Sequence, residues 1–350
     1  MLKVLTALCE APQKPESLPT FKIRCSSLPT VGNILCHTIA NDDIQYRNPV
    51  TKKCEGDIFD FINAWMLLHD NPASDTTKPP GTPITAWGVK ASPKGVGSCN
   101  FQPPEALCKQ TVFISPVGNC DEFSPNTTDD EPLFHSVITP ATAISDIHDD
   151  GVLIATLLAQ LYGAKLLFTW PATTANRKFF RDYHGRDHFL VLGDAISKMD
   201  GLKLTFLNPG DGVKLDPGMI HAVISLTNSA IGCWEYVDAE WFDTEEIQQG
   251  TEWLLDLIKT RQQPLPNEVT MAELYKPIAY GVNMWRAVLK RLDDATDEVS
   301  KRRKERIQEF IKWLQSEIPR EYVGDEEHTK GETGGSCRRK KRRIQRGRRE

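Results

Sequence analysis

Two histidines and one aspartate in this sequence are of the types that can hold a divalent metal ion. The stretch "SDIHDDG" (145–151) places His148 and Asp150 two positions apart. In an extended strand, side chains at positions i and i+2 point to the same face, so both groups could bind one ion. A His-x-Asp triplet carries little weight alone, because a polar turn can contain a histidine by chance. The pair therefore needs a third ligand from elsewhere in the chain.

His221 is the candidate for that third ligand. The stretch "PGDGVKLDPGMIHAVISL" (209–226) predicts a tight turn followed by an apolar strand that begins with this histidine. A lone histidine in such a place is usually a core residue hydrogen-bonded to the backbone. Together with His148 and Asp150, which come much earlier in the chain, it completes a set of two imidazoles and one carboxylate. That set matches the facial triad that binds Fe(II) on one side and leaves positions open for ligands.

Three stretches resemble the JmjC-domain dioxygenases, which depend on Fe(II) and 2-oxoglutarate. "SDIHDDG" is similar to the first motif of that family, "LYGAKLLFTWP" (161–171) to its strand-turn-strand with a lysine after the turn, and "PGDGVKLDPGMIHAV" (209–223) to its second-histidine segment. The resemblance covers about residues 112–240 and implies a double-stranded β-helix of the cupin type. It implies His148, Asp150 and His221 as iron ligands. It also implies that Lys165 pairs with the distal carboxylate of 2-oxoglutarate and that Ser145 assists.

The resemblance implies an oxygenase that acts on a protein substrate, with histone N-methyl-lysine demethylation and protein hydroxylation as the two reactions. The substrate would then be a protein segment, a histone tail among the candidates. Two positions depart from the family: Leu158 stands where demethylases often have a polar aromatic residue, and Glu235 stands where many members have asparagine. These departures favour a second hypothesis, a non-catalytic chromatin or protein-interaction module. A third is a metal-dependent cupin, such as an isomerase, which would not need Lys165.

The elements that must position these residues are predicted from hydrophobic periodicity. Short apolar runs cut by Gly, Pro, Asn and Asp predict strands, which suit a jelly-roll barrel in an α+β protein. Helical spacing predicts amphipathic helices on both sides of this β region. The predicted strands are 111–117, 133–139, 154–163, 164–170, 202–208, 212–218, 220–226 and 231–237, and the predicted helices are 56–70, 244–262, 270–295 and 299–318.

These elements divide the chain into four predicted parts. Residues 1–110 form an irregular and helical N-terminal region, in which 71–110 is a long surface loop. Residues 111–244 form the β-barrel, 245–320 a helical appendage and 321–350 a disordered basic tail.

Other metal sites are weaker candidates. His184 and His188 are four residues apart, with Asp182 and Asp187 beside them, and would share a helix face for zinc. Gly185 interrupts a helix there, so an exposed loop on the substrate side is the alternative. The nine cysteines include no Cys-x-x-Cys pair. Cys36 and His37 could join Cys25 or Cys54, but irregular spacing favours free thiols in a reducing compartment.

The charge is divided between an acidic body and a basic end. Residues 338–350 hold nine Arg or Lys and one acidic residue, Glu350, which gives them a net charge of +8. Because the whole chain has a net charge of −5, residues 1–337 have a net charge of −13. Such a block predicts a nuclear localisation signal or a nonspecific nucleic-acid contact, in a protein that is otherwise cytoplasmic. No apolar run is long enough to cross a bilayer, and the apolar stretch at the N-terminus is too short for a signal peptide, so no membrane association is expected.

Overall fold

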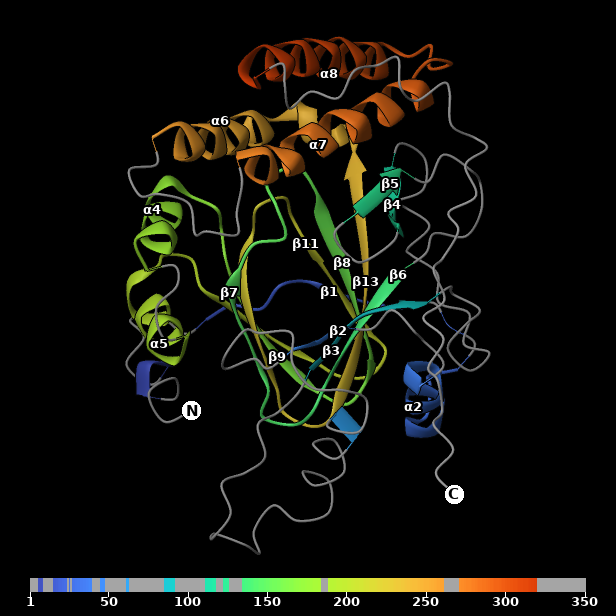
Figure 1. Cartoon of the computed structure of the whole chain (residues 1–350), viewed down its shortest axis with the longest axis vertical. Helices are drawn as coiled ribbons and strands as arrows, with labels where there is room; N and C mark the ends of the chain where they lie inside the picture. Colours follow the sequence, from blue (N-terminus) through green and yellow to red (C-terminus); the bar gives the residue numbers. More distant parts are fainter. Residues whose placement is uncertain are drawn as a thin grey trace, which may run out of the picture.

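The computed structural model describes most of the chain from residue 134 onward and shorter pieces before it. The described residues are 6–8, 15–23, 25, 27–39, 45–47, 61–62, 85–91, 111–117, 122–125, 134–183, 188–260 and 271–319. They form a mixed α+β structure with two antiparallel sheets, in which helices cover one end and one side (Figure 1). In this part of the chain, no helix is long and apolar enough to cross a membrane.

The described strands form two sheets. The larger sheet has the order β1-β11-β8-β13-β6-β3-β2, with β4 paired to β13 and β5 to β4, and the smaller has the order β10-β9-β12-β7. The strands are β1 (Thr20–Lys22), β2 (Gln45–Arg47), β3 (Thr85–Ala91), β4 (Thr111–Val117), β5 (Glu122–Pro125), β6 (Phe134–Thr139), β7 (Ile144–His148), β8 (Ala155–Tyr162), β9 (Lys165–Trp170), β10 (Lys203–Leu207), β11 (Asp211–Leu215), β12 (Ile220–Ser225) and β13 (Ser229–Asp238).

The chain passes back and forth between the sheets from β6 to β13. Strands β6, β8, β11 and β13 belong to the larger sheet, and β7, β9, β10 and β12 to the smaller. Consecutive strands therefore belong to different sheets, with one exception. β9 and β10 are antiparallel neighbours within the smaller sheet. This alternation makes the two sheets face each other.

Side chains of alternate residues fill the space between the sheets. Leu158 of β8 and Cys233 of β13 pack there against Leu167 of β9 and Val223 of β12. The intervening residues point outward, because successive side chains in a strand alternate between faces. Trp234, for example, packs on the outer face of the larger sheet.

Helices surround the sheets, the longer ones being α4 (Thr174–Tyr183), α5 (His188–Lys198), α6 (Glu246–Lys259), α7 (Met271–Arg291) and α8 (Glu298–Glu317). Figure 1 shows α6, α7 and α8 stacked over one end of the sheets, and α4 and α5 along the side of the smaller sheet. Residues of α5 share a buried cluster with β9 and β12. A shorter helix, α2 (Val31–Ile39), precedes β2.

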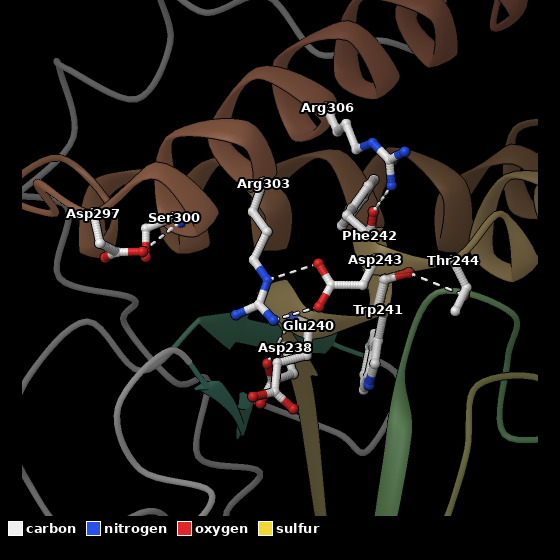
Figure 2. A network of polar contacts seen from close by, with 10 residues as sticks. All are labelled: Asp238, Glu240, Trp241, Phe242, Asp243, Thr244, Asp297, Ser300, Arg303 and Arg306. Atoms are coloured by element: carbon white, nitrogen blue, oxygen red, sulfur yellow. Dashed lines mark hydrogen bonds and ion pairs between the residues drawn. The ribbon is translucent and has the colours of Figure 1, made fainter.

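Polar contacts join α8 to the short 3-10 helix η2 (Ala239–Asp243), which follows β13. Arg303 donates to both carboxylate oxygens of Asp243, and Arg306 donates to the carbonyl of Phe242 (Figure 2). Asp297 caps the start of α8 by accepting from the backbone N–H of Ser300 at 2.9 Å. The bidentate Arg303 contact fixes the orientation of α8, although partial exposure limits its contribution to stability.

The predicted elements of the β region and the C-terminal helices are confirmed. Each of the eight predicted strands overlaps an observed strand from β4 to β13, and the last three predicted helices match α6, α7 and α8. Of the predicted helix 56–70, only residues 61–62 are described, and both are helical. The basic tail lies outside the described residues.

The prediction of a surface loop over 71–110 is wrong where the structure describes it. Residues 85–91 form β3, which pairs with β6 and extends the larger sheet. Its partners are distant in the sequence, and such distant pairing leaves no local signal. The exposed loop predicted around His184 is wrong at both described ends, because residues 179–183 belong to α4 and α5 begins at His188. These two helices cover the smaller sheet.

Gly163 forms the turn between β8 and β9 in a conformation that other residues adopt with strain. Its φ is +68°, and a Cβ atom there would overlap the carbonyl oxygen of Asn228. We therefore expect Gly163→Ala to lower the free energy of unfolding by about 3 kcal/mol or more, as measured by urea denaturation. Gly32→Ala on α2, where a Cβ would have room, is the control and should be neutral or slightly stabilising. Equal effects of the two substitutions would contradict this account.

Candidate metal centre

His148 is the last residue of β7, and a β-bulge turns its side chain toward the space between the sheets. His148 lies opposite His221 of β12, whereas Ser145 lies opposite Val223. The register therefore shifts by one residue between these pairs. Because of the extra residue, Ser145 and His148 share the inner face although they are three positions apart. Ile144 and Ile147 both pack on the outer face.

Asp150 reaches the site from a turn, not from the strand. β7 ends at His148, so the prediction that the pair would share one face of an extended strand is wrong. Gly151 turns the chain with φ of +120°, and its carbonyl accepts from the backbone N–H of Gly218 at 2.8 Å. This bond joins the turn that carries Asp150 to the turn before His221. The hydroxyl of Thr156 on β8 donates to Asp150 Oδ2 at 2.6 Å and orients the carboxylate.

His221 presents one ring nitrogen to the site and uses the other to hold its orientation. Its Nδ1 lies 3.2 Å from the carbonyl oxygen of Met219. Since a carbonyl can only accept, Nδ1 carries the proton and Nε2 keeps its lone pair for a metal. Burial, and then the nearby His148, lower the pKa of His221 to about 4. The imidazole is therefore neutral at pH 7, which is the form that binds a metal ion.

The three candidate ligands lie close enough to hold one ion. One ligand atom from each of His148, Asp150 and His221 lies within 4.8 Å of the other two. Nε2 of His148 is 3.6 Å from Asp150 Oδ1, and Nε2 of His221 is 3.9 Å from Asp150 Oδ2. The two imidazole rings are 4.1 Å apart between centroids. Neighbouring ligands about 2.1 Å from a metal are about 3 Å apart, so small movements of these side chains would bring the donor set to bonding distance of a divalent ion such as Fe(II).

Lys165 lies on the inner face of β9, away from the triad along the strands. Its partner on β12 is Ser225, whereas the partner of His221 on β9 is Thr169. Four residues of strand therefore separate the two levels, which corresponds to about 13 Å. Lys165 is 1% exposed, and burial lowers the pKa of its ammonium to about 8. No hydrogen bond or ion pair to this ammonium is found among the described residues.

An apolar layer lies between the level of Lys165 and the level of the triad. Leu158, Leu167, Val223 and Cys233 pack together there. Ser145 joins this layer, because it lies opposite Val223. The structure therefore places Ser145 between the two ends of the inner surface and Leu158 within its apolar part.

The buried charge of Lys165 gives a pH-dependent stability. Because the folded-state pKa of about 8 is below the ordinary value of 10.5, the unfolded state binds more protons between these values. The free energy of unfolding should therefore rise by about 3 kcal/mol from pH 8 to 10.5. Lys165→Met should lack this rise and be more stable than the wild-type protein at pH 7. Urea denaturation of both proteins at pH 7 and 10.5 tests this, and parallel pH dependences would refute it.

Two further residues of the site were missed or left open by the sequence patterns. Thr156 was not singled out, although its position in an alternating strand predicts an inner-facing side chain. Glu235 of β13 lies directly opposite Thr156. Burial and the charge of Asp150 raise the pKa of Glu235 to about 8. The departure from asparagine therefore places a carboxyl group beside the triad.

The rival metal sites gain no support. In the part of the chain that the structure describes, His148, Asp150 and His221 form the one group of three or more potential ligands. His184 to Asp187 lie outside the described residues, and α5 begins at His188. Cys36 and Cys233 are free thiols, as expected from the cysteine spacing, whereas Cys54 lies outside the described residues.

A cleft of about 740 Å³ lies at the same end of the sheets as the candidate metal centre. It is lined by the segment after β9, by the turn that leads to His221 and by η2 with the start of α6. Since His221 lies opposite Thr169, near the end of β9, the cleft and the triad are at the same end of the sheets. Three carboxylates and two indoles contribute to its lining: Asp216, Glu240, Glu246, Trp241 and Trp253.

Comparisons with known proteins leave the family open. No family model matches the chain, and no curated protein matches it. Among solved structures, the chain is similar to "The structure of KdgF from Halomonas sp.", with 11% sequence identity and a TM-score of 0.20. That match covers 30% of this chain and 67% of the other. A likeness at this level supports no argument about fold or function, so the function has to be inferred from the residues of the site.

Proposed function

We propose that this protein is an Fe(II)- and 2-oxoglutarate-dependent oxygenase of the JmjC type that acts on a protein substrate. The observation that carries the proposal is the buried ammonium of Lys165 on the same inner surface as the triad. A buried charge without an ionic partner is costly and calls for an anion. A dicarboxylate with one carboxylate at the metal and the other at Lys165 would supply it.

We propose further that the two sheets form a double-stranded β-helix. The strand order supports this, because the eight strands from β6 to β13 divide into two four-stranded layers, β6-β13-β8-β11 and β7-β12-β9-β10, with one step within a layer, from β9 to β10. A jelly-roll barrel of the cupin type has this arrangement. The pattern of inner-facing and outer-facing side chains agrees with a closed interior.

Each candidate residue has a role in this chemistry. His148, Asp150 and His221 would hold the metal, Thr156 and the Met219 carbonyl would keep two of the ligands in place, and Lys165 and Ser145 would bind the co-substrate. Bound iron would supply the redox chemistry that consumes O₂, converts 2-oxoglutarate to succinate and CO₂, and oxidises a substrate C–H bond. If that carbon belongs to an N-methyl group, the hydroxylated product loses formaldehyde. Otherwise a stable alcohol remains.

The cleft supports a peptide as the substrate. Its volume exceeds what a dicarboxylate needs, and its carboxylates and indoles suit a basic side chain. One basic side chain of the protein already lies in this cleft. The guanidinium of Arg177 is 5.3 Å from the Trp253 ring, and this is the kind of contact that a basic substrate could make there. A basic protein segment, with histone tails among the candidates, is therefore the substrate class to test.

One observation favours the non-catalytic alternative, a JmjC-fold module for chromatin or protein interaction. The apolar layer around Leu158 and Leu167 lies where 2-oxoglutarate would pass between Lys165 and the metal. If this layer stays packed, the co-substrate has no room. A metal-dependent cupin without 2-oxoglutarate, such as an isomerase, would leave the buried Lys165 without a purpose.

Succinate formation separates these functions. The Fe(II)-loaded protein is incubated with 2-oxoglutarate and O₂, with and without basic peptides that contain methylated or unmethylated lysine. The oxygenase proposal predicts succinate, increased by a suitable peptide, together with a change in peptide mass that corresponds to one added oxygen or one lost methyl group. Absence of succinate with an iron-loaded protein would favour the interaction module.

For the basic tail, residues 338–350, we propose nuclear targeting or nonspecific nucleic-acid binding. Nine cations without an apolar period cannot form a core and suit a phosphate backbone. Deletion of 338–350 should abolish nuclear accumulation of a fluorescent fusion and flatten the salt dependence of DNA binding. Deletion of 325–337, which removes a similar length without the basic block, is the control. No change in either readout would refute the proposal.

A further inference from the structure

Glu235 points into the space between the sheets, next to the metal centre. On β13, Ile231 and Cys233 pack between the sheets, whereas Trp234 and Tyr236 pack on the outer face. Because side chains alternate along a strand, Glu235 shares the inner face with Ile231 and Cys233. It is the inner-facing residue of β13 that lies at the level of the triad.

The surroundings of Glu235 connect it to Asp150. Its cross-strand neighbour is Thr156, whose hydroxyl donates to Asp150 Oδ2 at 2.6 Å. The Oε2 atom of Glu235 is shielded from solvent and has no hydrogen-bond partner among the described residues. This carboxyl oxygen is buried and has no partner in the described part of the chain, and Thr156 lies between it and the candidate ligand Asp150. It can therefore interact with a molecule that binds at the open positions of the metal.

The charge of Glu235 changes what the metal attracts. A divalent ion with Asp150 and two neutral imidazoles keeps a net charge of +1, which favours anions. Adding the Glu235 carboxylate brings the local charge to zero. Burial and the charge of Asp150 hold the pKa of Glu235 at about 8 without a metal. A divalent ion nearby lowers this pKa, so the carboxylate form is favoured once the ion is bound.

We propose that Glu235 weakens the binding of all anions at the metal, so that an anion needs a second contact, such as one to Lys165, to bind well. A ligand with a single negative group would then bind poorly. A ligand with a second carboxylate that reaches Lys165 would regain affinity and be selected, because specificity is often built from a repulsive element combined with an attractive one. This inference rests on the proposed metal site and deepens the proposed choice of 2-oxoglutarate.

The test uses the full-length protein loaded with Co(II), whose visible absorption reports ligand binding without turnover. Azide is the probe with a single charge, and 2-oxoglutarate is the dianion. Glu235→Gln removes the charge and keeps the shape, so azide and 2-oxoglutarate should both bind about tenfold more tightly or better than to the wild-type protein. Glu309→Gln, a change at an exposed position of α8, should leave both affinities unchanged.

The two arms separate this inference from the proposed function. Unchanged or weaker azide binding by Glu235→Gln would overturn the role of Glu235, whatever 2-oxoglutarate does. Tighter azide binding with no 2-oxoglutarate binding in either protein would support that role and count against the oxygenase. Failure of the wild-type protein to bind Co(II) would overturn both. If Glu235→Gln does not fold, as judged by circular dichroism, Glu235→Asn provides the same comparison.

Discussion

His148→Ala is expected to lose the metal. The two imidazoles and the carboxylate are the described groups that converge on one point, and removing one of them leaves two ligands for an ion that needs at least three from the protein. Changes to residues that only orient a ligand typically reduce metal affinity about 10-fold to 100-fold. We therefore expect His148→Ala and Asp150→Asn to reduce Co(II) affinity by more than about a hundredfold.

Thr156→Val provides an intermediate test of the same geometry. It removes the hydroxyl that donates to Asp150 Oδ2 and nearly preserves the shape, so the loss should be about 10-fold to 100-fold. Asp200→Asn, on an exposed residue outside the site, is the control for removing a carboxylate. Cobalt titration followed by visible absorption measures the four variants and the wild-type protein. A His148→Ala protein that binds cobalt as tightly as the wild type would rule out this metal centre.

Local sequence patterns predicted the β region well because its strands are strongly periodic. In "IHAVISL", for instance, a polar group stands in an apolar strand, and this is what identified His221. The same patterns could not show how Asp150 reaches the site. Its position depends on the bulge in β7 and on the bond between Gly151 and Gly218, which join segments that are far apart in the sequence.

Pairing over long distances explains the other differences. β3 is stabilised by its pairing with β6, and α5 is stabilised by packing on the outer face of the smaller sheet. Because these contacts are long-range, neither segment needs a strong periodic pattern in its own sequence. The place of Glu235 beside Asp150 likewise follows from the pairing of β13 with β8. From the sequence alone, Glu235 was a departure from a family pattern. The register of β13 and β8 places its carboxyl group near the candidate metal centre.

Lys165→Ala should raise the concentration of 2-oxoglutarate needed for binding by about two orders of magnitude or more. Truncating one partner of a buried ion pair typically costs about 3–5 kcal/mol, and each 1.4 kcal/mol is about tenfold in affinity. The ammonium is buried and has no ionic partner in the described part of the chain, so the co-substrate would be that partner. Lys198→Ala, on the exposed end of α5, is the matched control.

The value of this substitution is that it leaves the metal ligands untouched. Lys165 is four residues along the strand from the partner of His221, so Lys165→Ala should bind Co(II) as the wild-type protein does while losing affinity for 2-oxoglutarate. His148→Ala should show the opposite order, because without metal the co-substrate has no first contact. Calorimetric titration of Co(II) and then of 2-oxoglutarate distinguishes the two patterns. If Lys165→Ala binds 2-oxoglutarate as well as the wild type does, the buried ammonium serves another purpose and the interaction-module hypothesis becomes the better account.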